Sequence, residues 1–562
     1  MACNVIWFRR DLRLADHEPL IEGCRRGAIL PLFILDPALL NHPETAPARV
    51  AFLLECLRSL DGDLRRRGGR LVVRRGDPVE ELVRVVKASG ADGVIAHTDS
   101  ERIVGRIRDA AVNRRLASEG MAIRWIEPAG ACGDLRSYPA WSRRWHAAMA
   151  EPAPAAPPRV QLPPSIGELA DLPLPDLEAL GLRPDGKPLP SAGSAAALER
   201  LERFCEGPAS RTYYWELSYP SARVTSGLSP YLKFGAITAR QCLQRLAPLA
   251  GDEGGRRRSA LQLASRLRWA AAIHQRFRYL PQLELRSLWR SYDGADEHDP
   301  ADAALDAATA ELYAAWREGR TGFPIVDAAA RCLQAEGGWL ELNFRSRAIH
   351  ASFLTHLCGI DWRWGALHFM RHLIDGDCPI DHYQWAMQAG VTAVGPGGWA
   401  RIYHPGQVAV NRCDPQGLFI RRWLPELAGL TNDQLGCPPL MADYPRPILD
   451  YETARQRRLT TLERRRAQLE DPRRELARLP GHYRPFAADL SDAVAMPELF
   501  PTALDPDALE PGQWDALLSW FQLSRRGADR APSAAGSRRR RPRRPAPPGQ
   551  LSLDLGIGDD VG

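Results

Sequence analysis

Short apolar runs alternate with charged, helix-like stretches along the first 130 residues. The runs lie at 4–8, 29–35, 70–74, 93–97 and 123–126, and the segments between them are long enough to hold helices. Strands that alternate with helices of this length build a parallel sheet with helices on both faces. The pattern therefore predicts a doubly wound α/β domain over residues 1–130. No G-x-G-x-x-G follows the first run, so the sheet lacks the usual dinucleotide-binding fingerprint.

The pattern changes twice after this domain. Residues 131–195 are rich in proline and alanine, as in E-P-A-P-A-A-P-P, and this composition predicts an extended connector between two domains. Helical spacing resumes near Ala196 and continues to about residue 486, which predicts an all-α domain over residues 196–486. Residues 487–523 predict a small helical extension, and residues 524–562, basic and poor in apolar side chains, predict a disordered tail.

Charged residues interrupt the apolar pattern inside the helical domain. Between residues 321 and 427, Ile349, Phe353 and Leu357 recur at the spacing of one helix face. Arg347 and Asp375 fall at positions that would otherwise face the core. A buried charge is costly unless it is paired, so we expect these groups to turn toward one another or toward a ligand.

Composition narrows the class of protein. A chain of 562 residues is too long for one core, and 45% hydrophobic with 25% charged residues is ordinary for a soluble globular protein. No apolar run reaches the roughly 18 residues that span a bilayer. The N-terminus enters a strand at once, so we expect no signal peptide, no membrane segment and a cytoplasmic protein. The 11 cysteines include no C-x-x-C pair, which favours free thiols and no metal site.

The formal net charge of +6 originates in the tail. Arginines 538–541, 543 and 544 supply six positive charges, so the remainder of the chain is nearly neutral. A nucleic-acid surface on the folded part must therefore be a local patch.

The segment T-S-G-L-S-P at residues 225–230 has the features of an anion site. It supplies hydroxyl groups, backbone N–H groups left accessible by Gly227, and a proline that suits the first turn of a helix. A helix start of this kind suits a phosphate group. For the segment taken alone, a plain helix cap is the simpler interpretation.

Several motifs occur in order: W-F-R-R-D-L-R-L-A-D-H, T-S-G-L-S-P, N-F-R-S-R-A-I-H, L-I-D-G-D and R-I-Y-H-P. Together they resemble the photolyase and cryptochrome family over roughly residues 1–450. The resemblance implies an antenna domain followed by a helical domain that binds FAD. It assigns cofactor contacts to Tyr213, Thr225, Ser226, Gly227, Leu228, Ser229, Arg347, Asp375, Gly376, Asp377 and Asp381.

The resemblance also implies a reaction. In photolyases, reduced FAD excited by blue or near-ultraviolet light passes one electron to a pyrimidine dimer flipped out of DNA, and the dimer splits. The chain would then be a deoxyribodipyrimidine photolyase-like lyase that acts on damaged DNA as a monomer. Trp269 would stack on the lesion, and Arg345 and Arg401 would contact DNA phosphates.

Three positions around the implied lesion pocket depart from the photolyase pattern. Arg266 stands where photolyases usually carry a glutamate that hydrogen-bonds the dimer, and an arginine accepts no hydrogen bond. Ala348 replaces a methionine, and Met387 replaces a tryptophan. These changes leave two other functions open: a cryptochrome-type blue-light receptor without repair activity, and a flavoprotein that has lost both activities.

The implied electron-transfer chain is incomplete. Trp385 and Trp362 match its flavin-proximal and middle members, and both count among the implied catalytic residues. Asp306 stands at the distal position, so the path to the surface would end elsewhere, at Tyr313 or Trp364.

Two details of the implied pigments have alternatives. A count without gaps from L-I-D-G-D places Asp381 opposite flavin N5, where an acid is able to protonate the flavin, whereas a gap of one residue places His382 there. Val104 and Gly105 stand where many folate-binding relatives carry Asn-Glu. This disfavours a folate antenna and leaves a deazaflavin or no antenna.

The tail ends in a second recognisable segment. Gln550, Leu551, Leu553 and Leu555 resemble the short motif with which bacterial repair proteins bind the sliding clamp. Leucines on a basic, disordered tether have no core to join, so binding in a partner's groove is a physical explanation. The alternative is an unstructured end.

Overall fold

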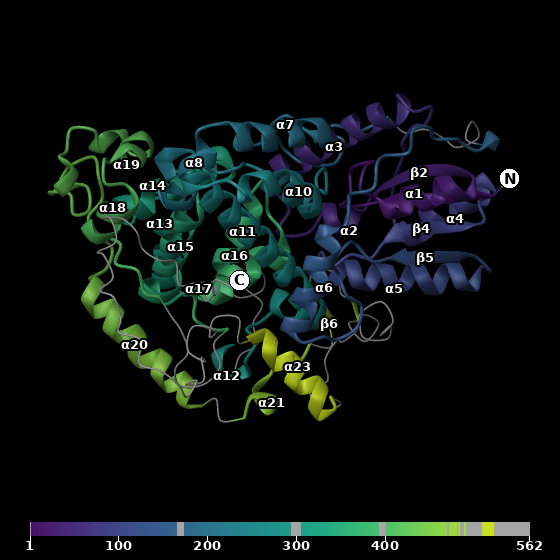
Figure 1. Cartoon of the computed structure of the whole chain (residues 1–562). Helices are drawn as coiled ribbons and strands as arrows, with labels where there is room; N and C mark the ends of the chain where they lie inside the picture. Colours follow the sequence, from purple (N-terminus) through teal and green to yellow (C-terminus); the bar gives the residue numbers. More distant parts are fainter. Residues whose placement is uncertain are drawn as a thin grey trace, which may run out of the picture.

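The computed structural model describes residues 2–165, 173–293, 305–392, 401–468, 471–479, 482–483, 488–489 and 509–521. A sheet with its helices forms one end of the molecule, and a larger group of helices forms the other (Figure 1). The predicted tail, with Gln550, Leu551, Leu553 and Leu555, lies outside the described residues.

Five parallel strands form the sheet. They are β1 (Cys3–Phe8), β2 (Ala28–Leu35), β3 (Val72–Arg75), β4 (Gly93–His97) and β5 (Ala122–Ile126), in the spatial order β3-β2-β1-β4-β5. Each predicted strand corresponds to one of these, with ends displaced by at most two residues, so the predicted doubly wound fold is confirmed.

Alternate residues of β1 face two separate cores. Ile6 and Phe8 pack with α1 (Glu18–Arg26) and α3 (Pro47–Arg65) on one face of the sheet. Val5 and Trp7 pack with α4 (Pro78–Ser89) and α5 (Ile103–Ser118) on the other face. Because both faces are covered, the strand is a continuous apolar run and not an alternating one.

The segment between the domains is docked and largely irregular. It begins with α6 (Tyr138–Ala150) and ends at α7 (Gly193–Glu206). Between these helices, Val160 and Leu180 are buried in the core that α3 shares with α7. The connector therefore covers the sheet domain instead of standing away from it.

The remaining helices form the all-α domain. Around the large cavity described below stand α8 (Ala209–Glu216), α9 (Ser229–Lys233), α10 (Ala239–Ala250), α11 (Gly254–Tyr279), α15 (Phe344–Ser352), α16 (Trp362–His372) and α17 (Cys378–Gln388). The outer helices are α12 (Arg290–Asp293), α13 (Ala307–Glu318), α14 (Pro324–Glu336), α18 (Gln407–Cys413), α19 (Leu418–Trp423), α20 (Tyr451–Ala467) and α21 (Pro472–Glu475). None of the described helices is both long and apolar enough to cross a membrane.

Two features of this domain were not predicted. Directly after α15, residues Phe353–Cys358 form a π-helix, and every residue in it is buried. Beyond α21 the helical pattern does not continue to residue 486, because β6 (His482–Tyr483) pairs with β7 (Ala488–Asp489) as a short antiparallel ladder.

Further along, α23 (Pro511–Phe521) packs on α6 through Trp520, whose indole Nε1 donates to the Arg136 carbonyl at 2.7 Å.

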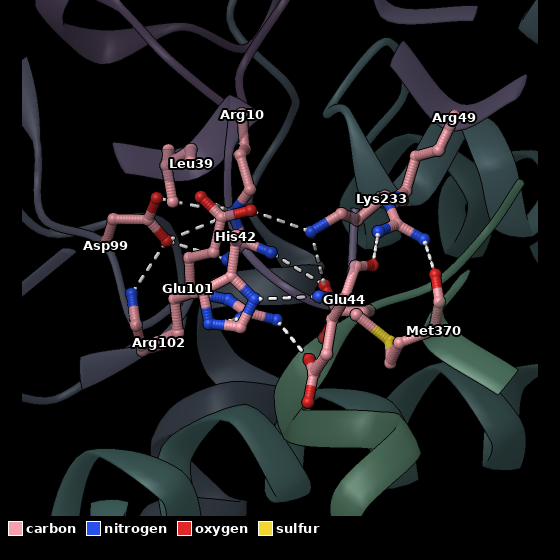
Figure 2. Close-up of polar contacts among 12 residues, drawn as sticks. Arg10, Leu39, His42, Glu44, Arg49, Asp99, Glu101, Arg102, Lys233 and Met370 are labelled. Atoms are coloured by element: carbon pink, nitrogen blue, oxygen red, sulfur yellow. Dashed lines mark hydrogen bonds and ion pairs between the residues drawn. The ribbon is translucent and has the colours of Figure 1, made fainter. Parts of the chain in front are cut away.

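A buried arginine joins the two domains. Arg49 on α3 donates through Nη1 to the carbonyls of Met370 (2.7 Å) and Leu373 (2.8 Å) at the end of α16. Its Nη2 donates to the Glu44 carbonyl at 2.6 Å, and Figure 2 shows the bond to Met370. One side chain therefore satisfies three backbone acceptors where the domains meet.

We expect Arg49→Leu to lower the free energy of unfolding by about 3 kcal/mol or more, because it leaves buried carbonyls without a donor. Arg58→Leu is the matched control, since Arg58 lies on the same helix with 46% of its side chain exposed; we expect a change within about 0.5 kcal/mol. Urea denaturation of the flavin-free proteins measures both values. Equal effects of the two substitutions would contradict this account of the interface.

Candidate functional site

A cavity of about 600 Å³ lies in the helical domain, at its border with the sheet domain. Pockets of this size hold cofactors and drug-sized ligands. One wall is the face of α11 formed by residues at helical spacing, and another is the face of α17. The lining from these two helices is Leu263, Arg266, Leu267, Ala270, Ala271 and His274, and Ile380, Asp381, Gln384, Trp385 and Gln388.

The 225–229 loop closes one side of the cavity. Thr225, Ser226, Gly227, Leu228 and Ser229 all line it, and α9 begins at Ser229. The residue in the cap position is Leu228, so no side chain caps the helix, and the plain-cap interpretation is wrong. The hydroxyl groups stay available for a ligand.

Gly227 brings the backbone of this loop close to a cation. Its φ is +65°, and a Cβ at this position would lie 2.5 Å from Nε of Arg200. The guanidinium of Arg200 lies over the ring of Trp339, another residue that lines the cavity. Only glycine combines this φ with so close an approach.

Arg347 and Asp375 both line the cavity and form an ion pair. The Arg347 Nη2 atom lies 3.4 Å from the Asp375 carboxylate, and Arg347 Nε donates to the Leu342 carbonyl at 2.9 Å. The guanidinium also bonds to the Gly338 carbonyl. Backbone acceptors thus orient the arginine, and the predicted pair is brought together at the cavity wall.

Asp377 is the most strongly paired acid of the wall. Its carboxylate lies 2.6 Å from Arg10, 3.1 Å from His274 and 3.6 Å from Lys233. Burial by itself would raise the pKa of Asp377, but these three groups hold it well below its ordinary value. Gly376 borders a second, smaller cavity instead, and a Cβ there would meet Arg49 at 2.5 Å.

The structure places Asp381 in the cavity wall, and His382 is not among the lining residues. Asp381 is 8% exposed, and its Oδ2 has no hydrogen-bond partner among the described residues. Burial raises the pKa of Asp381 to about 8, against the opposing charge of His382. The acid is therefore protonated at neutral pH.

Arg266 lines the cavity near Tyr213, and burial lowers its pKa and raises that of Tyr213. The guanidinium lies 5.7 Å from the centre of the Phe344 ring, and Nη2 has no hydrogen-bond partner among the described residues. A donor without a carboxylate partner thus faces the space where the sequence analysis placed the lesion.

Trp269 and Met387 are not among the residues that line the cavity. Trp269 packs against Tyr383 at 6.1 Å between ring centres. The cavity-facing side of α11 runs through positions 266, 270 and 274, and position 269 lies on another side of a helix with 3.6 residues per turn. Trp269 thus lies beside this cavity and not in its lining, and its stacking on a lesion stays a prediction.

Arg345 and Arg401, the two predicted DNA-phosphate contacts, differ in their surroundings. Arg345 is 4% exposed, and its Nη1 donates to the Tyr403 hydroxyl at 2.8 Å. Arg401 is half-buried, and its carbonyl accepts a hydrogen bond from Ser352 at 3.1 Å. Arg345 therefore positions the 401–403 segment instead of facing solvent, and Ala348 lines the cavity as predicted.

Aromatic rings connect the cavity wall to the surface. Trp385 lies 6.0 Å from Trp316, which stacks on Tyr313 at 5.9 Å. Tyr313 lies 5.3 Å from half-buried Trp364 and donates to its carbonyl at 2.9 Å. The ring of Trp362 instead lies beside His382, 5.9 Å between centres.

Three residues of the wall were missed by the sequence analysis: Arg10, Lys233 and His274. Arg10 belongs to the W-F-R-R-D motif, and His274 continues the spacing of Arg266 on α11. The motif could have indicated Arg10, and the helical spacing could have indicated His274. Lys233 had no signal, because only the approach of α9 to Asp377 gives it a role.

Two protein-family models match the chain: DNA photolyase over residues 4–132, and the FAD-binding domain of DNA photolyase over residues 263–464. The deoxyribodipyrimidine photo-lyase of Synechococcus sp. is 32% identical over 504 residues, which cover 84% of this chain and 99% of that protein. The chain belongs to the photolyase and cryptochrome family.

Both branches of the family are represented among its relatives. Cryptochrome-1 of Arabidopsis thaliana is 29% identical over 490 residues, which cover 81% of this chain and 69% of that protein. The crystal structure of a class III photolyase from Agrobacterium tumefaciens matches with a TM-score of 0.70 and 25% identity, covering 83% of this chain and 98% of that one.

The cavity fits the FAD that family membership implies. The buried side-chain atoms of its lining residues that lack a hydrogen-bond partner among the described residues include Arg266 Nη2, Asp381 Oδ2, Gln384 Oε1 and Gln388 Oε1. Buried polar atoms usually have a partner, so these atoms require a ligand with polar groups of its own. The 225–229 loop suits the cofactor's phosphates, and the Arg347–Asp375 pair suits its ring.

We expect Gly227→Ala to weaken flavin binding at least tenfold, because the added methyl group meets Arg200 and closes the loop. Gly254→Ala is the matched control: Gly254 has the same φ of +65°, but nothing lies within 4 Å of its Cβ position. Flavin titration of the apoproteins gives the two affinities. If both variants lost flavin equally, backbone strain and not the loop geometry would be responsible.

Proposed function

We propose that this protein is a deoxyribodipyrimidine photolyase-like lyase that uses FAD and blue or near-ultraviolet light to split pyrimidine dimers in DNA. The observation that carries the proposal is the cavity of the FAD-binding domain, whose buried polar atoms await a ligand. When bound, the reduced and light-excited flavin supplies one electron to the dimer and receives it back after the dimer has split.

The residues of this chain have distinct tasks in that reaction. Thr225, Ser226 and Ser229 bind the cofactor's phosphates with their hydroxyl groups. Arg347 and Asp375 orient the ring from one side of the cavity. The apolar parts of α11 and α17 exclude water, which would otherwise quench the reactive states.

Arg266 determines how a lesion would be recognised. Its free Nη2 is a donor, so it binds an acceptor: a carbonyl oxygen of the flipped pyrimidine dimer or a phosphate oxygen beside it. Photolyases usually place an acid at this position. Trp269, which packs against Tyr383 beside the cavity, stacks on the lesion.

A second function, that of a blue-light receptor, is favoured by one observation. Asp381 faces the cavity as a neutral acid, and a proton donor beside the flavin stabilises the light-reduced form that a receptor needs. A receptor would accumulate this form in light and leave DNA dimers intact.

We propose that the protein carries a deazaflavin antenna or none. Two smaller cavities lie where the domains meet, one of about 240 Å³ beside Arg9 and His97 and one, the second cavity, of about 120 Å³, and both are below the roughly 300 Å³ of small ligand sites. The charged side chains of the second cavity bond to one another, as for Arg102 with Glu44 at 2.7 Å (Figure 2).

We further propose that the protein works in the cytoplasm as a monomer and that its tail assists repair. The arginines of the tail neutralise DNA phosphates without reading sequence. Gln550, Leu551, Leu553 and Leu555 bind the groove of a bacterial sliding clamp.

The test of the main proposal is light-dependent repair. Purified protein with chemically reduced FAD is mixed with an oligonucleotide carrying one cyclobutane dimer, under near-ultraviolet light and in the dark. We expect the dimer to disappear only in light, which chromatography of the digested oligonucleotide measures. A flavin that is bound and photoreduced while the dimer persists would overturn repair and favour the receptor.

We expect Trp316→Phe to slow light-driven reduction of the bound flavin about tenfold, because phenylalanine is much harder to oxidise than tryptophan and Trp316 contacts Trp385. Trp289→Phe is the control, since Trp289 is equally buried but packs against Phe521. Absorbance under blue light with an added thiol measures the rate. A full rate in Trp316→Phe with a loss in Trp362→Phe would assign the path to Trp362.

A further inference from the structure

His382 and Glu44 stand behind Asp381, on the side away from the large cavity. His382 is 2% exposed, and its Nε2 lies 3.1 Å from Glu44 Oε1. Its other ring nitrogen, Nδ1, lies 3.9 Å from Asp381 Oδ2. Neither this nitrogen nor Oδ2 has a hydrogen-bond partner among the described residues, so a small rotation of either side chain brings them into contact.

The three groups hold different charges. Burial opposes the imidazolium of His382, but its neighbours, with the Glu44 carboxylate at 3.1 Å as the ionised one, raise the pKa of His382 well above its ordinary value. Burial also opposes the Glu44 carboxylate, yet His382 and Arg102 hold its pKa well below the ordinary value. A neutral acid in the cavity wall, Asp381, is thus backed by a buried cation and anion.

The same groups reach the second cavity. Glu44 Oε2 accepts a hydrogen bond from Arg102 Nη2 at 2.7 Å, and Arg102 Nη1 lies 2.7 Å from Nδ1 of His42. Glu44, Arg102 and His42 all line this cavity, and Figure 2 shows them together. A line of polar groups therefore joins the two cavities across the domain boundary.

We propose that His382, held as a cation by Glu44, returns a proton to Asp381 after Asp381 has given its own proton to the bound flavin. This inference rests on the proposed function only because it requires a bound flavin that gains an electron in light. An external thiol supplies that electron through Trp385. The Asp381 O–H bond then breaks as an N–H bond forms on the flavin. The His382 Nδ1–H bond breaks as the acid re-forms, which leaves His382 neutral with its Nε2–H directed at Glu44.

The other charged groups around Asp381 are unsuited to this role. Arg347 and Asp375 face it from across the cavity, but they are paired with each other, and an arginine does not release its proton at neutral pH. Glu44 is ionised and lies beyond His382. The Cys378 thiol contacts His382, and burial raises its pKa to about 11, so it keeps its proton. Behind Glu44, Glu284 lies 3.6 Å from Arg102.

The experiment uses the complete, FAD-loaded chain after a light flash, with a thiol as reductant, in H₂O and D₂O. It follows proton uptake by the flavin and the return of the proton to Asp381, which the infrared band of the protonated carboxyl group reports. We expect Asp381→Asn to abolish fast uptake, and Glu44→Gln and His382→Gln each to slow the return of the proton to Asp381 at least tenfold without slowing the uptake or the arrival of the electron. Uptake in the unmodified protein is expected to fall as the pH rises through about 8, because Asp381 then ionises.

Glu101→Gln is the matched control. Glu101 is a glutamate of the same interdomain group, but it binds Lys233 at 2.9 Å and not His382. For Glu101→Gln we expect proton uptake by the flavin and proton return to Asp381 at the rates of the unmodified protein. A second measurement needs no flavin: nuclear magnetic resonance of the histidine ring nitrogens at pH 7 is expected to show His382 charged in the unmodified protein and neutral in Glu44→Gln.

Unmodified rates of proton return to Asp381 in both Glu44→Gln and His382→Gln, or a neutral His382 in the unmodified protein, would overturn the proposal. If His382→Gln fails to bind flavin, the rate of proton return in Glu44→Gln and the histidine nitrogen spectra test the proposal instead. Repair of the dimer is measured in parallel. Loss of repair with normal proton uptake would refute the proposed function and leave this inference standing.

Discussion

The buried carboxylate of Asp377 is the constraint around which the two domains are arranged. A carboxylate that is removed from water needs cations and hydrogen-bond donors close by, and no single element supplies them. Arg10 arrives from the end of β1, Lys233 from α9 and His274 from α11. The wall of the large cavity forms where these elements meet, so pairing this charge also shapes the site.

The first turn of α17 separates two acids with opposite protonation states. Asp377 precedes the helix and is ionised, because His274, Lys233 and Arg10 surround it and hold its pKa well below the ordinary value. Asp381, one turn later, faces the cavity with an unpaired Oδ2 and keeps its proton. One acid therefore anchors the domains, and the other is free to act on a ligand. The difference comes from the partners supplied by other elements.

Much of the fold and part of the site were predictable from local pattern. The strands were found because burial on both sheet faces leaves uninterrupted apolar runs, as in β1. The 225–229 loop was found because hydroxyl groups and a glycine at a helix start have few other uses. Where the pattern was silent, the cause was packing between distant segments: nothing in the spacing of α9 indicates that Lys233 approaches Asp377.

The sequence by itself determined the sheet, the helical domain, the cofactor loop and the Arg347–Asp375 pair, because each depends on local spacing or on a short motif. Only the tertiary structure decided that Asp381 and not His382 faces the cavity, and that Arg345 is buried against Tyr403. It alone brought Glu44, which lies more than 300 residues away along the chain, to His382. Spacing specifies which side of a helix a residue occupies, but the neighbours of that side are specified by packing between distant segments.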